Sequence, residues 1–182
     1  MEEVLSQTSY TEQLKAVWEK AVALYQKGGQ DASVFFDPSE TAFLDSIGTS
    51  AQEVFDFAED WVTGQDPDFL TFALITDCRR NYFLIQQKSE RSNKIVDTGD
   101  LPPKDEQVWG VEWLPRIIPK AKAKLRGEMS SNLMFCCGGD RNFFRKHGIA
   151  PSTFLQVVVA FEKDDDAIVD WVLKHSIAVN PG

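Results

Sequence analysis

The chain matches itself when it is shifted by 100 residues, and this register limits the folds that it can adopt. The match runs without a gap from residue 13 to residue 61. The identical pairs are Leu14 and Leu114, Lys20 and Lys120, Ala21 and Ala121, Ala23 and Ala123, Phe35 and Phe135, Phe43 and Phe143, and Gly48 and Gly148. The order of elements also repeats, so we favour an internal duplication. The alternative is that two strings of amphipathic helices align by chance.

Apolar residues recur at helical spacing through most of the chain. In residues 10–27, Leu14, Val17 and Trp18 share one face, and Gly28 follows as a stop. Similar patterns predict helices over about 38–48, 51–64, 66–87, 116–127, 140–148, 151–161 and 165–174. The prediction is an all-α fold of two tandem pseudo-equivalent helical units that pack together, with little or no sheet.

Residues 89–112 interrupt the helical pattern. They contain Pro102-Pro103, two glycines and alternating charges, which is typical of a linker. The predicted organisation is a first helical repeat over 1–88, a linker over 89–112 and a second repeat over 113–182. Ile95-Val96 and Val108-Trp109 are the parts of this linker that we expect to pack onto a neighbour or to pair as short strands.

Large aromatic residues are expected to form the core of each unit. The candidates are Phe43 and Phe143, and Trp61 and Phe161, with Gly48 or Gly148 as the turn between two helices. Trp18, Trp113 and Trp171 are expected to be mostly buried as well.

Charge and composition exclude some classes of function. The formal net charge of −9 argues against a general nucleic-acid binder, because phosphates are bound by an excess of Lys and Arg. The sequence contains no membrane span and no secretory signal, so we expect an acidic, cytoplasmic protein. Its three cysteines, two of them adjacent, do not form a disulfide framework.

The two halves carry opposite charge. Residues 13–88 contain six basic and twelve acidic groups, net −6, whereas residues 113–176 contain ten basic and seven acidic groups, net +3. Apolar stripes and unlike charges predict that the halves pack on each other.

The second half contains a recognisable run of residues. Residues 108–128 read VWGVEWLPRIIPKAKAKLRGE, and GGDRNFF and AIVDWV follow. Over about residues 108–175 the chain resembles the bacterial domain-of-unknown-function family 5069, and WLPR followed by Lys120-Ala121 is the most specific part. The resemblance implies a small helical domain and no activity, cofactor or catalytic residue. The first half lacks WLPR and is connected to the family only through the repeat.

The basic helix of the second half is the leading candidate site. Arg116, Lys120, Lys122 and Lys124 lie on a broad face opposite the apolar stripe, and Arg126 follows near the end of the helix. The hypothesis is a non-enzymatic binding module that holds an acidic protein or a small anion. The alternative is an ordinary solvated face.

The loop from Cys136 to Arg141 is the second candidate. Gly138 and Gly139 ahead of a helix that Asp140 is expected to cap would let backbone N–H groups approach an anion, and Arg141 would add charge. This loop supports the alternative of a small enzyme or a thiol-based sensor at Cys136 and Cys137. Both cysteines are otherwise small buried fillers.

The sequence contains no motif for a metal, a cofactor or a catalytic residue. The two histidines, His147 and His175, are far apart and lack a ligand motif. A structural or assembly protein is therefore the third hypothesis.

Overall fold

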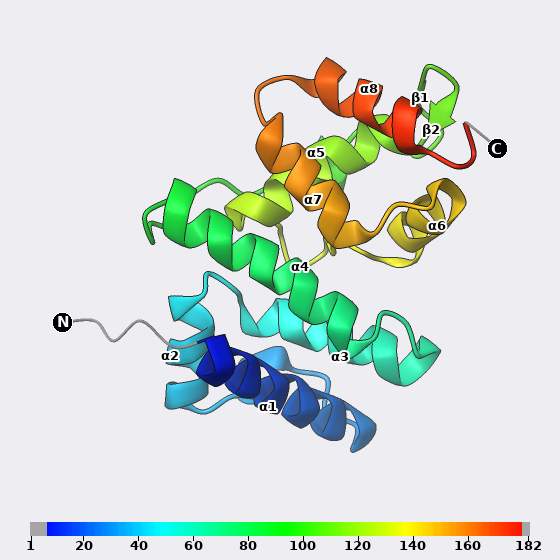
Figure 1. Cartoon of the computed structure of the whole chain (residues 1–182). Coiled ribbons are helices and arrows are strands. Elements are labelled where there is room, and N and C mark those ends of the chain that lie inside the picture. Colours follow the sequence, from blue (N-terminus) through cyan, green and yellow to red (C-terminus); the bar gives the residue numbers. More distant parts are fainter. Residues whose placement is uncertain (1–6, 180–182) are drawn as a thin grey trace. The chain divides into compact units, whose positions relative to one another are not determined.

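The computed structural model describes residues 7–179 (Figure 1). By its internal contacts the chain divides into two compact units, Met1–Arg80 and Asn81–Gly182. Each unit is described by itself below.

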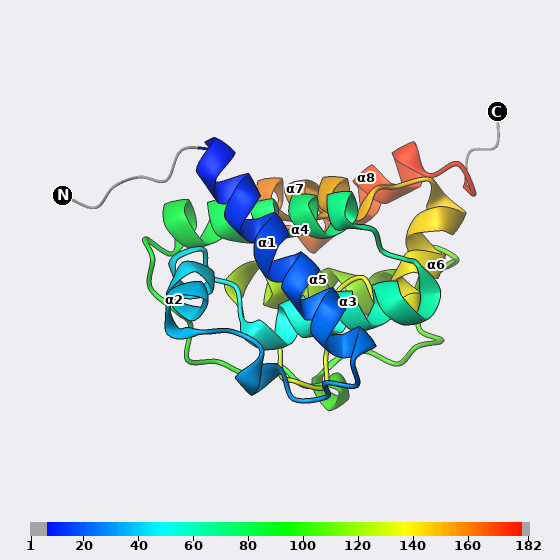
Figure 2. The ribbon, with the colours of Figure 1, turned by 90° about the horizontal axis from the view of Figure 1, so that it is seen from below.

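The first unit consists of helices joined by short turns. It contains α1 (Gln7–Gln26), a 3-10 turn η1 (Ala32–Val34), α2 (Pro38–Ser46), α3 (Ala51–Gly64) and α4 (Phe69–Asn81), whose last residue crosses the boundary. α1 lies against α3 (Figures 1 and 2), and Leu14 and Val54 are fully buried. Local signals set the helix starts, since Asp37 and Ser50 each form a capping box at the starts of α2 and α3.

The second unit is built around one helix, α5 (Leu114–Arg126). The other elements are a π-helical turn η2 (Tyr82–Gln86), a 3-10 turn η3 (Thr98–Asp100), the hairpin β1 (Gln107–Val108) and β2 (Val111–Glu112), and helices α6 (Gly138–His147), α7 (Pro151–Ala160) and α8 (Asp165–His175). α5 contacts α7, α8, η2 and β1, and α7 crosses it in Figure 1. Leu114, Ile117 and Ala121 of α5 are fully buried.

The predicted fold class is confirmed: the chain is mainly helical, and the one sheet within residues 7–179 has two short strands. The helices also follow the predicted order. α2 begins at Pro38 and α6 at Gly138, while α3 begins at Ala51 and α7 at Pro151. The duplication stays a prediction, because matching order does not show that the helices cross in matching directions.

Residues 89–112, predicted as a linker, lie within the second unit, and the division between units falls after Arg80. Val96 and Leu101 are buried against Ala123 and Leu133. Val96 also exchanges backbone hydrogen bonds with Glu128 and Ser130, at 2.7 and 3.0 Å. Two apolar residues and a few long-range hydrogen bonds hold this segment, and a Pro-rich, charged pattern does not reveal them.

The predicted core aromatics are confirmed in part. Phe43 and Phe143 are buried, and Gly48 and Gly148 adopt positive φ between their helices. Phe161 is 39 % exposed, so its prediction was wrong; it lies at the C-cap of α7, where the helical face no longer determines burial. Trp18 is buried, whereas Trp61, Trp113 and Trp171 are partly exposed.

Candidate functional site

The basic face of α5, the leading candidate from the sequence, is largely covered, whereas the alternative of a solvated face would leave it exposed. Arg116, Lys120 and Lys124 are only 6 %, 3 % and 2 % exposed. Arg116 donates from Nη1 to the carbonyl oxygen of Pro102 at 2.6 Å, so the segment predicted as a linker covers this side of α5. Helical periodicity separates apolar from polar residues but does not show that a loop lies over the polar side.

A buried ion pair joins α5 to the start of α6. Lys120 Nζ lies 2.7 Å from Oδ2 of Asp140, and Asp140 is fully buried. The same Oδ2 accepts a hydrogen bond from the backbone N–H of Cys136 at 2.8 Å, and Oδ1 accepts one from Trp113 Nε1 at 2.9 Å. We call Trp113, Lys120, Cys136, Cys137 and Asp140 the Asp140 cluster. Both carboxylate oxygens are satisfied, as a buried charge requires.

The loop ahead of α6 packs closely against Trp113. Cys137, which precedes Gly138, is the N-cap of α6, so the predicted capping role of Asp140 is wrong. A side chain at Gly139 would place its Cβ 2.5 Å from Cζ2 of Trp113. A residue larger than glycine would therefore clash with the indole ring at position 139.

The two cysteines have different environments. Cys136 is fully buried with φ of 72°, and its carbonyl oxygen accepts a hydrogen bond from Arg141 Nη1 at 2.7 Å. Cys137 is partly exposed, and its Sγ accepts from Lys120 Nζ at 3.1 Å. The structure thus brings together the predicted residues Arg141, Lys120 and Cys136, but in a closed cluster.

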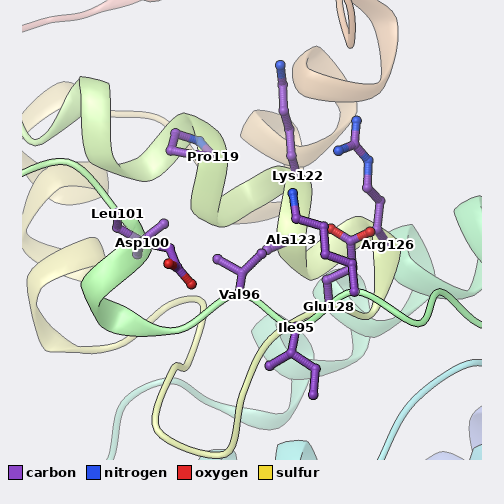
Figure 3. A pocket seen from close by; sticks show the side chains of 10 residues that line it. Ile95, Val96, Asp100, Leu101, Pro119, Lys122, Ala123, Arg126 and Glu128 are labelled. Carbon is purple, nitrogen blue, oxygen red and sulfur yellow. The ribbon is translucent and has the colours of Figure 1, made fainter.

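A cavity of about 370 Å³ lies on another side of α5. We call it the α5 cavity (Figure 3). Its lining residues come from the 94–101 segment, from α5 and from the residue after Gly127: Lys94, Ile95, Val96, Asp100, Leu101, Pro119, Lys122, Ala123, Arg126 and Glu128. Only Lys122 and Arg126 among them belong to the predicted basic face. Figure 3 shows both rising from α5, with Asp100 and Glu128 on opposite sides of Val96.

Hydrogen bonds to Glu162 hold the side chain of Arg126 in place. Its Nε and Nη2 donate to Oε1 of Glu162 at 3.1 and 2.7 Å, and the Tyr82 hydroxyl donates to the same oxygen at 2.6 Å. Burial alone would raise the pKa of Glu162, but these hydrogen bonds reverse the effect and lower it. Within residues 7–179 the two hydrogen bonds from the guanidinium to Glu162 use Nε and Nη2, while the side chain of Arg126 also lines the cavity.

Glu128 is the functional candidate that sequence reasoning missed. It is 6 % exposed; its Oε1 accepts from Ser92 Oγ at 2.7 Å, and its Oε2 is buried without a partner among the described residues. A signal was present in the sequence. Glu128 directly follows the C-cap Gly127, where the negative end of a helix disfavours a carboxylate.

A smaller hollow of about 210 Å³ lies beside the Asp140 cluster and includes His147. His147 is buried, and its Nδ1 lies 2.6 Å from Oγ of Ser176. Burial lowers the pKa of His147, and the neighbouring Lys146 charge lowers it further. The neutral imidazole is therefore the form that the folded unit favours.

This lowered pKa predicts that acid destabilises the second unit. Below the ordinary His value of about 6.5 the unfolded chain binds a proton that folded His147 resists, so the free energy of unfolding falls until the pH passes below the folded pKa. Urea unfolding at several pH values between 7.5 and 5 measures this slope. His147→Gln should flatten it and the control His175→Gln should keep it. An equal slope in wild type and His147→Gln would contradict the prediction.

Neither a metal centre nor a membrane span is found in the part of the chain that the structure describes. Within residues 7–179, no three His, Cys, Asp or Glu side chains lie close enough to hold a metal ion. No helix in the same range is long and apolar enough to cross a membrane.

The second unit is a small helical domain with a closed ion-pair cluster and one charged cavity beside its central helix. Residues 102–181 match the family model Domain of unknown function (DUF5069), so this part of the chain is similar to that family. The match includes α5, the Asp140 cluster and the α5 side of the cavity, whereas Lys94 to Leu101 precede it. No curated protein and no solved structure matches the chain.

Proposed function

We propose that the second unit is a non-enzymatic binding module, and that the α5 cavity holds the acidic group of a small molecule. Three cationic side chains at one cavity support this proposal: Lys94, Lys122 and Arg126. The cavity volume lies at the small end of the range of about 300 to 1,000 Å³ that is usual for ligand sites. The hypothesis of a basic helix thus keeps Lys122 and Arg126, but not the buried Arg116, Lys120 and Lys124.

Arg126 is the residue on which the proposal depends most. Glu162 and Tyr82 fix its Nε edge, so the side chain is already ordered before a ligand arrives. A planar guanidinium that lines a cavity is suited to bind a carboxylate or phosphate oxygen. Lys122 forms an ion pair with the exposed Asp165 and can contribute a second charge at a small cost, because exposed ion pairs are weak.

The test is an NMR titration of the ¹⁵N-labelled full chain with two probes, hexanoate and inorganic phosphate. At least one probe should shift the backbone amides of residues 122–128. Arg126→Gln should weaken this binding about tenfold or more, as expected when a charged hydrogen bond is lost. Arg126→Lys should lose part of the affinity because it keeps the charge but not the planar donor pair.

Lys163→Gln is the matched control, since Lys163 is exposed in the same unit and does not line the cavity. It should bind like wild type. The proposal fails if neither probe shifts these amides, or if Arg126→Gln and Lys163→Gln bind the probes equally.

A further inference from the structure

One carboxylate oxygen of Glu128, which lines the α5 cavity, lacks a hydrogen-bond donor within residues 7–179. Its Oε2 is buried and receives no hydrogen bond from the described part of the chain. A buried carboxylate oxygen without a donor costs the full desolvation of that atom, whereas most buried polar atoms have partners. Glu128 is therefore the residue of this cavity whose hydrogen bonding is incomplete.

The hydrogen-bond donors near Glu128 are directed to other acceptors. The backbone N–H of Glu128 donates to the carbonyl of Ala123, and the N–H of Ser130 donates to the carbonyl of Val96. Arg126 lines the same cavity but directs its bonds to Glu162, and no ion pair joins Glu128 to a Lys or Arg within residues 7–179. Residues 7–179 therefore supply no donor to Oε2 of Glu128, and a bound ligand could provide it.

The cavity has a third feature besides its two kinds of charge, an apolar wall. Val96, Leu101, Pro119 and Ala123 line the cavity together with the charged residues. Glu128 lines the same cavity, and the last torsion of a Glu side chain has a broad distribution. A short hydrocarbon chain would cover the apolar wall while its charged ends meet the polar residues.

We propose that the ligand of the α5 cavity is a small zwitterion whose ammonium group binds Glu128 and whose acidic group binds Arg126. This inference rests on the proposed function for the acidic end and adds the ammonium end. An ammonium group has three donors and no acceptor, which complements a carboxylate oxygen that lacks a donor. The chemical class is an amino acid or amino acid-like molecule with a short apolar spacer.

The experiment compares three probes of equal chain length in NMR titrations of the full chain: 6-aminohexanoate, hexanoate and hexylamine. The same set is repeated with the four-carbon 4-aminobutanoate, butyrate and butylamine. In at least one set, wild type should bind the amino acid at least tenfold more tightly than either partner compound. Glu128→Gln should bind the amino acid and the simple acid equally, and the exposed-residue control Asp170→Asn should keep the preference.

The other possible outcomes distinguish the zwitterion proposal from the proposed function. Equal binding of the amino acid and the simple acid to wild type overturns the zwitterion and leaves the proposed function standing. Equal binding of the amino acid and the amine overturns both, because the acidic group is then not recognised. Absence of binding by all probes overturns the zwitterion, and the proposed function then stands only if inorganic phosphate shifts the amides of residues 122–128. Since the wild-type comparison alone separates these cases, the inference stays testable if Glu128→Gln does not fold.

Discussion

Asp140→Ala is expected to lower the free energy of unfolding of the second unit by about 3 to 5 kcal/mol, the range for removing one member of a buried ion pair. The substitution leaves the Lys120 ammonium, which is 3 % exposed, without its carboxylate. It also removes the acceptor of Trp113 Nε1 and of the Cys136 N–H. The large loss of stability comes from the buried Lys120 charge that is left without a partner, and not only from the lost attraction between Lys120 and Asp140. Urea unfolding followed by circular dichroism measures it.

Two further variants test whether the loss of stability comes from the unpaired charge of Lys120. Asp170→Ala removes an exposed carboxylate of the same unit and should change stability by no more than about 0.5 kcal/mol. The double variant Lys120→Met with Asp140→Leu removes both charges and should recover much of the loss, because apolar residues often replace buried ion pairs well. A loss below about 1 kcal/mol for Asp140→Ala would contradict the expectation and mean that Cys137 or water replaces the carboxylate.

Trp113→Ala is expected to lower the free energy of unfolding by about 3 kcal/mol, near the lower limit for large aromatic residues in cores. Trp113 is partly exposed, so its truncation loses less apolar burial than that of a fully buried ring. It also takes the Nε1 donor from Asp140 and uncovers Gly139, which lies directly under the ring. The lost donor adds to the lost packing.

Trp109 provides a matched control for Trp113, four residues away on the β1–β2 hairpin and 80 % exposed. Trp109→Ala removes the same chemical group without a buried contact and should change stability by at most about 0.5 kcal/mol. Chemical denaturation of both variants, followed by circular dichroism, gives the comparison. Equal losses for the two variants would show that the Asp140 contact and the Gly139 packing contribute nothing.

The predicted helices follow from interactions between near neighbours in the chain. Asp37 and Ser50 cap α2 and α3 through bonds to residues two or three positions away, and such patterns are legible in the sequence. Gly48 and Gly148 end helices because their positive φ is inexpensive for glycine. Local chemistry therefore predicted the fold class and most helix boundaries.

The candidate site was predicted less well because its decisive contacts are long-range. Lys120 and Asp140 are 20 residues apart, and no spacing rule shows that one neutralises the other inside the unit. Arg126 was identified on the basic helix, but its acceptor Glu162 lies 36 residues further along the chain. The sequence thus indicated which residues carry charge, and not which of those charges are free.

One physical cause explains why some features could be predicted from the sequence and others only seen in the tertiary structure. Periodicity, caps and turns arise within a few residues, so the sequence alone determined a helical chain with α5 as an amphipathic element. Burial of a polar face depends on which distant segment covers it. The 94–102 segment covers Arg116 and forms one wall of the α5 cavity, and only the tertiary structure could place it there. For the same reason, the unpaired oxygen of Glu128 became visible only after its neighbours were in position.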